Sequence, residues 1–205
     1  MRDIEILKQI KQFFNVGTIS YNLNKTSAIF RVRSLNDLSI ILKFFQKFPL
    51  LTSKRHNFNL FVILYEIICR KQHLTITGFM KAIAIINNIN NPIKPELLAE
   101  IIHSFGPLPL LILPPVTILD KFFLIPNPWW IIGFICGEGS FTYGSSKYIT
   151  AKFGYRIKYQ LFFEIAQNTK DIYILQAILK FLGTGIISSA AEREKEKYLN
   201  LRLEI

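Results

Sequence analysis

The segment from Trp129 to Phe141 reads WWIIGFICGEGSF, an apolar run that ends in Gly-Glu-Gly and continues as a strand-like sequence. In a helix, Gly133 and Gly137 lie one turn apart on one side, where they leave a notch that a second backbone can approach closely. Glu138 falls at the C-terminal end of this helix, where the helix dipole disfavours a carboxylate. A divalent cation would offset that cost. The alternative is a glycine-rich helix end with one solvated glutamate.

An internal repeat divides the chain. Residues 3–20 (DIEILKQIKQFFNVGTIS) match residues 171–188 (DIYILQAILKFLGTGIIS) at nine of eighteen positions, with helical spacing, then a glycine, then the start of a strand. Such self-similarity indicates two copies of one structural unit. We expect a first unit at residues 1–103, a proline-rich apolar connector at 104–128, and a second unit at 129–205.

Both copies combine helices with strands that follow one another closely, which predicts an α+β fold with antiparallel sheets. In the first copy, alternation over residues 18–33 puts Arg31 and Arg33 on one strand face, and a helix is expected after Asn36 or Asp37.

The second copy contains a longer strand with two unlike faces. From residue 155 to 167, aromatic and aliphatic residues alternate with polar ones. The polar set is Arg156, Lys158, Gln160 and Glu164. This pattern predicts a sheet with one cationic face.

Composition narrows the class of partner. Half of the residues are hydrophobic and only 19% are charged, yet the net charge is +11. A folded protein with such a basic excess usually binds nucleic acid, and an anionic membrane surface is the competing reading. The apolar stretch 104–136 is interrupted by six prolines and by Asp120 and Lys121, so no run reaches the roughly 20 residues of a membrane span. Heavy use of Ile, Phe, Asn, Lys and Tyr is typical of AT-rich genes and favours a protein encoded and made in mitochondria, in the matrix.

Three separated blocks resemble the LAGLIDADG homing endonucleases and intron maturases of the mitochondrial type. IIGFICGEG (131–139) resembles the motif that names the family, and FFQKFPLLTSKRHNF (44–58) and KQHLTITGFMKAI (71–83) resemble segments downstream of it. The resemblance implies two pseudo-symmetric units, each a saddle-shaped antiparallel sheet with helices on one face, with two motif helices side by side at their interface. Both units are expected to be incomplete here: the first lacks its motif helix and first two strands, and the second lacks its C-terminal helices.

The resemblance also implies roles for individual residues. Gly133 and Gly137 would pack the motif helices, Glu138 would bind Mg²⁺ near the scissile phosphates, and Lys54 would assist the chemistry. The residues expected to contact nucleic acid are Arg31, Arg33, Lys54, Arg55, Lys147, Arg156, Lys158 and Gln160. The alternative for these cations is a solvated sheet face.

The sequence departs from the family at the catalytic acids. Metal-assisted cleavage needs an acid from each motif helix, but the 205 residues contain one such helix, and Cys136 stands where the family often has an acid. We therefore expect a nucleic-acid-binding protein without independent cleavage and without a cofactor, with RNA favoured as its partner, in the manner of a maturase or an organelle-ribosome component.

Other interpretations remain open. The chain could be an active metal-dependent endonuclease for double-stranded DNA seen incompletely, or one half of a split one. It could also be a structural subunit of a ribonucleoprotein assembly. A second polypeptide could complete the fold.

Overall fold

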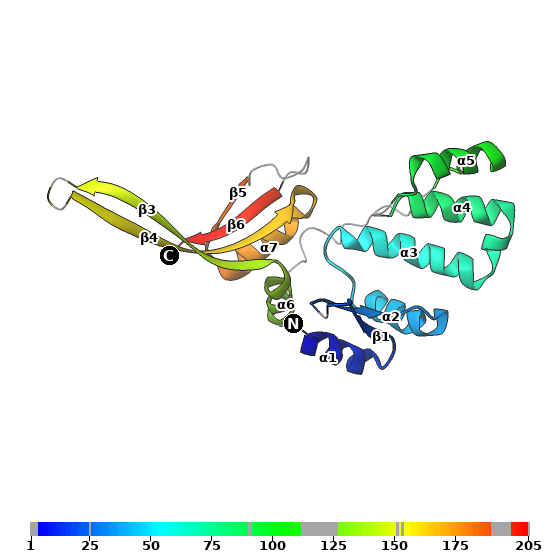
Figure 1. The fold of residues 1–205 in the computed structure, drawn as a ribbon, viewed down its shortest axis with the longest axis horizontal. Helices are drawn as coiled ribbons and strands as arrows, with labels where there is room; N and C mark the ends of the chain where they lie inside the picture. The colour runs from blue at the N-terminus through cyan, green and yellow to red at the C-terminus, as the bar shows by residue number, and fades with distance from the viewer. Residues whose placement is uncertain are drawn as a thin grey trace. The chain divides into compact units, whose positions relative to one another are not determined.

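The chain folds into two compact units in a computed structural model, Met1–Leu113 and Pro114–Ile205 (Figure 1). The structure describes residues 4–24, 26–89, 92–111, 127–150, 152, 154–189 and 198–204. The predicted connector falls largely on residues 112–126, which lie outside the described residues.

The first unit is mainly helical. Its elements are α1 (Ile4–Phe14), β1 (Thr18–Tyr21), β2 (Ala28–Arg31), α2 (Leu35–Lys47), α3 (Lys54–Cys69), the 3₁₀ turn η1 (Gln72–Leu74), α4 (Ile76–Asn87) and α5 (Pro95–Phe105). Strands β1 and β2 form an antiparallel pair. The core lies between α3 and α4, where Leu60, Ile67, Ala82 and Ile85 form one buried cluster.

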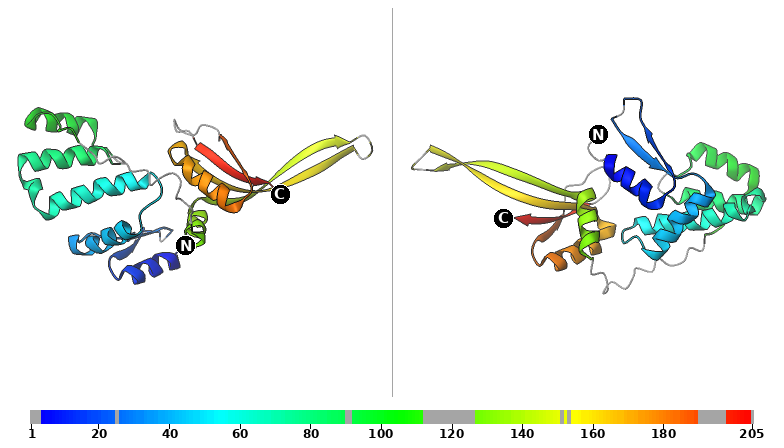
Figure 2. Two further views of the ribbon diagram at one scale, coloured as in Figure 1. Left: turned by 180° about the vertical axis from the view of Figure 1, so that it is seen from behind. Right: turned by 90° about the horizontal axis from the view of Figure 1, so that it is seen from below.

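The second unit is a helix followed by an antiparallel sheet. Its elements are α6 (Pro128–Glu138), β3 (Gly139–Thr150), β4 (Gly154–Asn168), the 3₁₀ turn η2 (Thr169–Asp171), α7 (Ile172–Leu182), β5 (Ile186–Ser189) and β6 (Tyr198–Glu204). The strand order is β3-β4-β6-β5. The β3–β4 hairpin is twisted and extends well past α7, which lies against the rest of the sheet (Figures 1 and 2). The α+β prediction is confirmed.

The internal repeat is visible in the structure. Helices α1 and α7 both have 11 residues and begin at repeat-equivalent positions, as do the four-residue strands β1 and β5. Asn15 and Gly183, which are equivalent, follow the helix ends with left-handed φ values of 55° and 72°. Left-handed residues commonly terminate helices because they redirect the chain while satisfying the last carbonyls.

Four element boundaries differ from the sequence prediction, and two of them lie on either side of Ser34. Helix α2 starts before Asn36, because Ser34 caps it by accepting a hydrogen bond from the Asp37 N–H at 3.1 Å. Strand β2 ends at Arg31, so Arg33 is not a strand residue.

Helices α5 and α6 each take residues from the ends of the predicted connector. Helix α5 runs to Phe105 before Gly106 ends it at a φ of 92°. Helix α6 starts at Pro128, which suits a first helical position, after Asn127 caps it by accepting from the Trp130 N–H at 2.9 Å. No helix in the described parts of the chain is long and apolar enough to cross a membrane.

We expect Gly17→Ala to destabilise the protein by about 2–4 kcal/mol, because two effects add. Gly17 has a φ of +81°, and an added Cβ would lie 2.7 Å from the Phe30 ring and 2.8 Å from the Arg31 carbonyl oxygen. The measurement is the free energy of unfolding from chemical denaturation followed by circular dichroism.

Gly183→Ala is the matched control. Its φ is +72°, but no described atom lies within 4 Å of an added Cβ, so only the left-handed penalty of about 1 kcal/mol should appear. Equal losses in the two variants would contradict the close packing of β2 over Gly17.

Candidate nucleic-acid interface

One face of the β3–β4 hairpin is polar and cationic, and we call it the polar face. The register pairs Tyr148 with Arg156, Ser146 with Lys158, and Gly144 with Gln160, and directly opposed residues share a face. The polar face therefore consists of Gly144, Ser146, Tyr148, Arg156, Lys158 and Gln160. Arg156 and Lys158 are exposed. The structure thus brings together three of the residues predicted to contact nucleic acid.

The outer part of the hairpin concentrates positive charge and contains no carboxylate. Residues 139–163 contain four cations, Lys147, Lys152, Arg156 and Lys158, and neither Asp nor Glu. Phosphate groups are attracted to such a surface, and the attraction falls as salt screens it. The first carboxylate along β4 is Glu164, near the base of the hairpin.

Lys147 lies on the opposite face of the hairpin from the polar face. It is paired in register with Ile157, and its Nζ lies 4.1 Å from the centre of the Tyr155 ring. A cation over an aromatic face is attracted by the ring quadrupole. Lys147 therefore does not share a surface with Arg156 and Lys158. It belongs to β3, which is an edge strand of the sheet.

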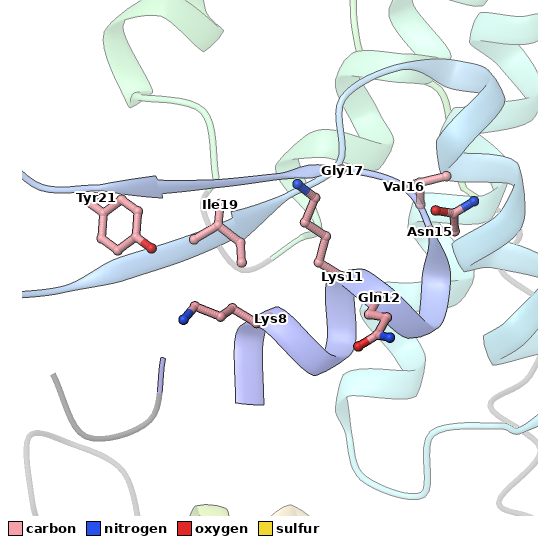
Figure 3. Close-up of a pocket in the computed structure, with 8 residues that line it drawn as sticks. All are labelled: Lys8, Lys11, Gln12, Asn15, Val16, Gly17, Ile19 and Tyr21. Carbon is pink, nitrogen blue, oxygen red and sulfur yellow. The ribbon is translucent and has the colours of Figure 1, made fainter. Parts of the chain in front are cut away.

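In the first unit, Arg31 lies on the sheet face away from α1. Ile19 and Tyr21 line a pocket of about 450 Å³ together with Lys8 and Lys11 of α1 (Figure 3). Thr18 alternates with Ile19, so it lies on the other face with its register partner Arg31.

The pocket between α1 and β1 is lined mainly by a solvated helix face. The Lys8 Nζ donates a 2.6 Å hydrogen bond to Glu5, which raises the pKa of Lys8. Both groups are exposed, and exposed pairs of this kind contribute little to stability.

The notch of α6 lies on the helix face that its own unit leaves open. Ile131 is only 3% exposed, whereas Trp129 is 80% exposed. Gly133 and Gly137 are exposed, and no described atom lies within 4 Å of a Cβ added at either glycine. The packing of a second helix into this notch is not seen within the unit and stays a prediction.

Glu138 does not form a metal site with its described neighbours. It is the last residue of α6 and is exposed. Among the residues that the structure describes, no group of three or more His, Cys, Asp or Glu side chains could hold a metal ion. Mg²⁺ in proteins commonly uses one or two carboxylates, water and substrate phosphates, so Glu138 could supply one ligand of a shared site only.

Lys54 and Arg55 open helix α3 in the first unit. The first turn of this helix contains no acidic residue. Cations at a helix N-terminus face the positive end of the dipole and are disfavoured, so an anion bound there would be stabilising. Lys54 is exposed and Arg55 is half-buried.

Sequence reasoning missed one position. Arg202 of β6 pairs with Ile186, as Arg31 pairs with Thr18, the repeat equivalent of Ile186. Arg202 also occupies the register position opposite Glu164. Extending the repeat through the second strand of each hairpin would have found it.

The sequence model of the LAGLIDADG endonuclease family matches residues 1–65 and 131–204. A probable intron-encoded endonuclease of Neurospora crassa is 29% identical over 187 residues, which are 91% of this chain and 33% of that protein. A second one from Neurospora crassa is 27% identical over 198 residues, or 94% of this chain and 42% of that protein. The chain thus spans well under half of these relatives.

Solved structures of a homing endonuclease are similar to this chain in fold. The I-SmaMI LAGLIDADG homing endonuclease bound to cleaved DNA has a TM-score of 0.76 and 29% identity, covering 98% of this chain and 63% of that one. The same endonuclease bound to uncleaved DNA with calcium ions has a TM-score of 0.75 and 28% identity, covering 98% and 65%.

The family match takes in both copies of the internal repeat. The matched ranges include α1 with β1 and β2 in the first unit, and α7 with β5 and β6 in the second. They cover more than half of the chain. The chain belongs to the LAGLIDADG endonuclease family.

Proposed function

We propose that this protein binds nucleic acid through the polar face of the β3–β4 hairpin, with RNA as its partner and without cleavage by these 205 residues alone. One observation carries the binding proposal: an exposed hairpin face with Arg156 and Lys158, in a segment with four cations and no acid. Backbone phosphates supply most of the affinity for such a surface. Arg31, Arg33, Lys54, Arg55 and Lys147 are proposed as additional contacts.

The proposal that these residues do not cleave on their own rests on the number of acidic residues at motif helix ends. Two-metal cleavage needs carboxylates around both attacking and leaving oxygens, and Glu138 is the one acid at a motif helix end in this sequence. A chain that has a nucleic-acid-binding face but only one catalytic acid suits a maturase or a component of an organelle ribonucleoprotein. The intron-encoded relatives support a mitochondrial origin, and the proposed location is the matrix.

A second candidate is a metal-dependent DNA endonuclease. The solved neighbours bound to DNA favour it. In that case a further motif helix, from the same or another polypeptide, would pack into the Gly133–Gly137 notch and bring a second acid beside Glu138. Lys54 would then assist the chemistry and Mg²⁺ would be the metal.

We expect the double variant Arg156→Gln, Lys158→Gln to weaken binding to a short duplex about tenfold or more and to lower the salt slope by about 2. The measurement is fluorescence anisotropy at several salt concentrations. The double variant Lys170→Gln, Lys180→Gln removes the same charge from exposed lysines of η2 and α7, is the matched control and should change neither quantity appreciably. Equal effects from the two double variants would show that binding follows net charge and not this face.

Gly133→Ala distinguishes an open notch from a packed one by the sign of its effect. Alanine is favoured over glycine inside a helix by about 1 kcal/mol, and the described residues leave space for its Cβ. We expect stabilisation of the 205-residue chain, measured by thermal unfolding. If Gly133→Ala instead lowers stability, a helix already occupies the notch.

RNA and DNA are compared directly with duplexes of one sequence. Competition binding should favour RNA, and incubation of a plasmid library with Mg²⁺ should give no cleavage. Cleavage that is lost in Glu138→Gln would overturn the RNA proposal and support the endonuclease. Tighter binding of DNA than of RNA, with no cleavage, would also overturn the RNA proposal and indicate a DNA-binding protein.

A further inference from the structure

The pocket between α1 and β1 combines positive charge, amide groups and an aromatic ring. Its volume is about 450 Å³, and its described lining contains neither Asp nor Glu. The polar and aromatic members of that lining are Lys8, Lys11, Gln12, Asn15 and Tyr21. The Tyr21 ring is 50% exposed, so one of its faces is open to a ligand. Such a lining suits an anion that carries a flat ring.

The side chains are distributed along the pocket in an order that a ligand could follow (Figure 3). Tyr21 and Lys8 lie at one end, Asn15 lies at the other, and Lys11 points from α1 toward the strands between them. Lys8 and Lys11 are three residues apart in α1, so they are neighbours on one helix face. A phosphate held by both ammonium groups would therefore have the Tyr21 ring beside it.

The polar side chains of the pocket are free to accept a ligand. Among the residues that the structure describes, no hydrogen bond or ion pair joins the side chain of Lys11, Asn15 or Tyr21 to another residue. Lys8 is paired with Glu5, but the two side chains are 53% and 68% exposed, and such a pair is weak. A phosphate monoester carries more charge than one carboxylate, so it can displace Glu5 from Lys8.

The second copy of the repeat shows that the local fold does not require this lining. Helix α7 and strand β5 have the same lengths as α1 and β1. The residues equivalent to Lys8, Lys11 and Tyr21 are Gln176, Leu179 and Ser189. The same helix, turn and strand therefore form without the two lysines and the tyrosine. A ligand site confined to the first copy would account for the difference.

We propose that this pocket binds one nucleotide, with its phosphate between Lys8 and Lys11 and its base stacked on Tyr21. Stacking on an aromatic ring tolerates any base, so little preference among bases is expected. The amides of Gln12 and Asn15 offer donors and acceptors to the sugar hydroxyls. The nucleotide is either free or part of a single strand. The inference goes beyond the proposed function and does not rest on it, because no residue of the hairpin lines the pocket.

The test uses adenosine monophosphate as the probe and the full chain carrying Arg156→Gln and Lys158→Gln, so that the polar face contributes little. Affinity is measured by ligand-detected NMR titration, and circular dichroism confirms that each variant is folded. In this background, Lys8→Gln combined with Lys11→Gln should weaken binding about tenfold or more, because both charged contacts with the phosphate are lost.

The matched control for the lysines removes the same charge from the second copy. Lys170→Gln combined with Lys180→Gln changes exposed residues outside the pocket, so it should alter the affinity by less than about twofold. Equal losses in this control and in the variant of Lys8 and Lys11 would overturn the proposal, as would the lack of saturable binding of adenosine monophosphate.

Tyr21→Ser tests the stacking. It should weaken binding of adenosine monophosphate about fivefold or more and leave the binding of inorganic phosphate unchanged. Tyr143→Ser, at a tyrosine of β3 that is 73% exposed and does not line the pocket, is its control and should change neither affinity. Inorganic phosphate bound as tightly as the nucleotide, with no effect of Tyr21→Ser, would overturn the nucleotide assignment and leave an anion site.

A short single-stranded RNA, titrated in the same background, distinguishes the two sources of the nucleotide. Tighter binding of the strand than of adenosine monophosphate, lost with Lys8→Gln and Lys11→Gln, would support a nucleotide within a strand. Equal or weaker binding of the strand would support a free nucleotide. Tighter binding of the strand that is unchanged in the lysine variant, together with unchanged binding of adenosine monophosphate, would contradict the site altogether.

Discussion

Burial of α7 against the base of β4 is the constraint on which the candidate interface depends. Strand side chains alternate strictly, so the burial of Ile165, in a strand that packs against α7, decides which face every other residue of β4 takes. Arg156, Lys158 and Gln160 each lie an odd number of residues before Ile165 in β4. They therefore take the opposite face of the strand and point away from α7. A slip of one residue in the pairing would exchange the cationic face for the apolar one.

The two units show the same sequence element under different constraints. In the second unit, the sheet has strands on both sides of β6, and the apolar face of α7 is fully buried. Among the described residues of the first unit, β2 pairs with β1 alone, and the buried cluster lies instead between α3 and α4, around Leu60 and Ile85. The repeat thus specifies local structure in both places, while burial depends on which neighbours are present.

Much of this could be predicted from sequence, because periodicity and turn residues act locally. The repeat predicted the matching of α1 with α7, and alternation predicted the faces of β4. Boundaries that depend on one side-chain cap, such as Ser34 before α2, were missed because Asn36 and Asp37 are equally good caps in sequence terms. The separation of Lys147 from Arg156 was missed because it depends on the cross-strand register of β3 with β4, which alternation within either strand does not specify.

The most direct test of the account places a photo-reactive phenylalanine analogue at neighbouring positions of β4 in the full chain. Irradiation with bound nucleic acid should give crosslinks from positions 158 and 160, on the polar face, and few from positions 157 and 159, on the opposite face. The alternation itself is the predicted result, since adjacent strand residues differ in little besides the face they occupy. Crosslinks of equal yield at all four positions, or mainly from 157 and 159, would contradict the account.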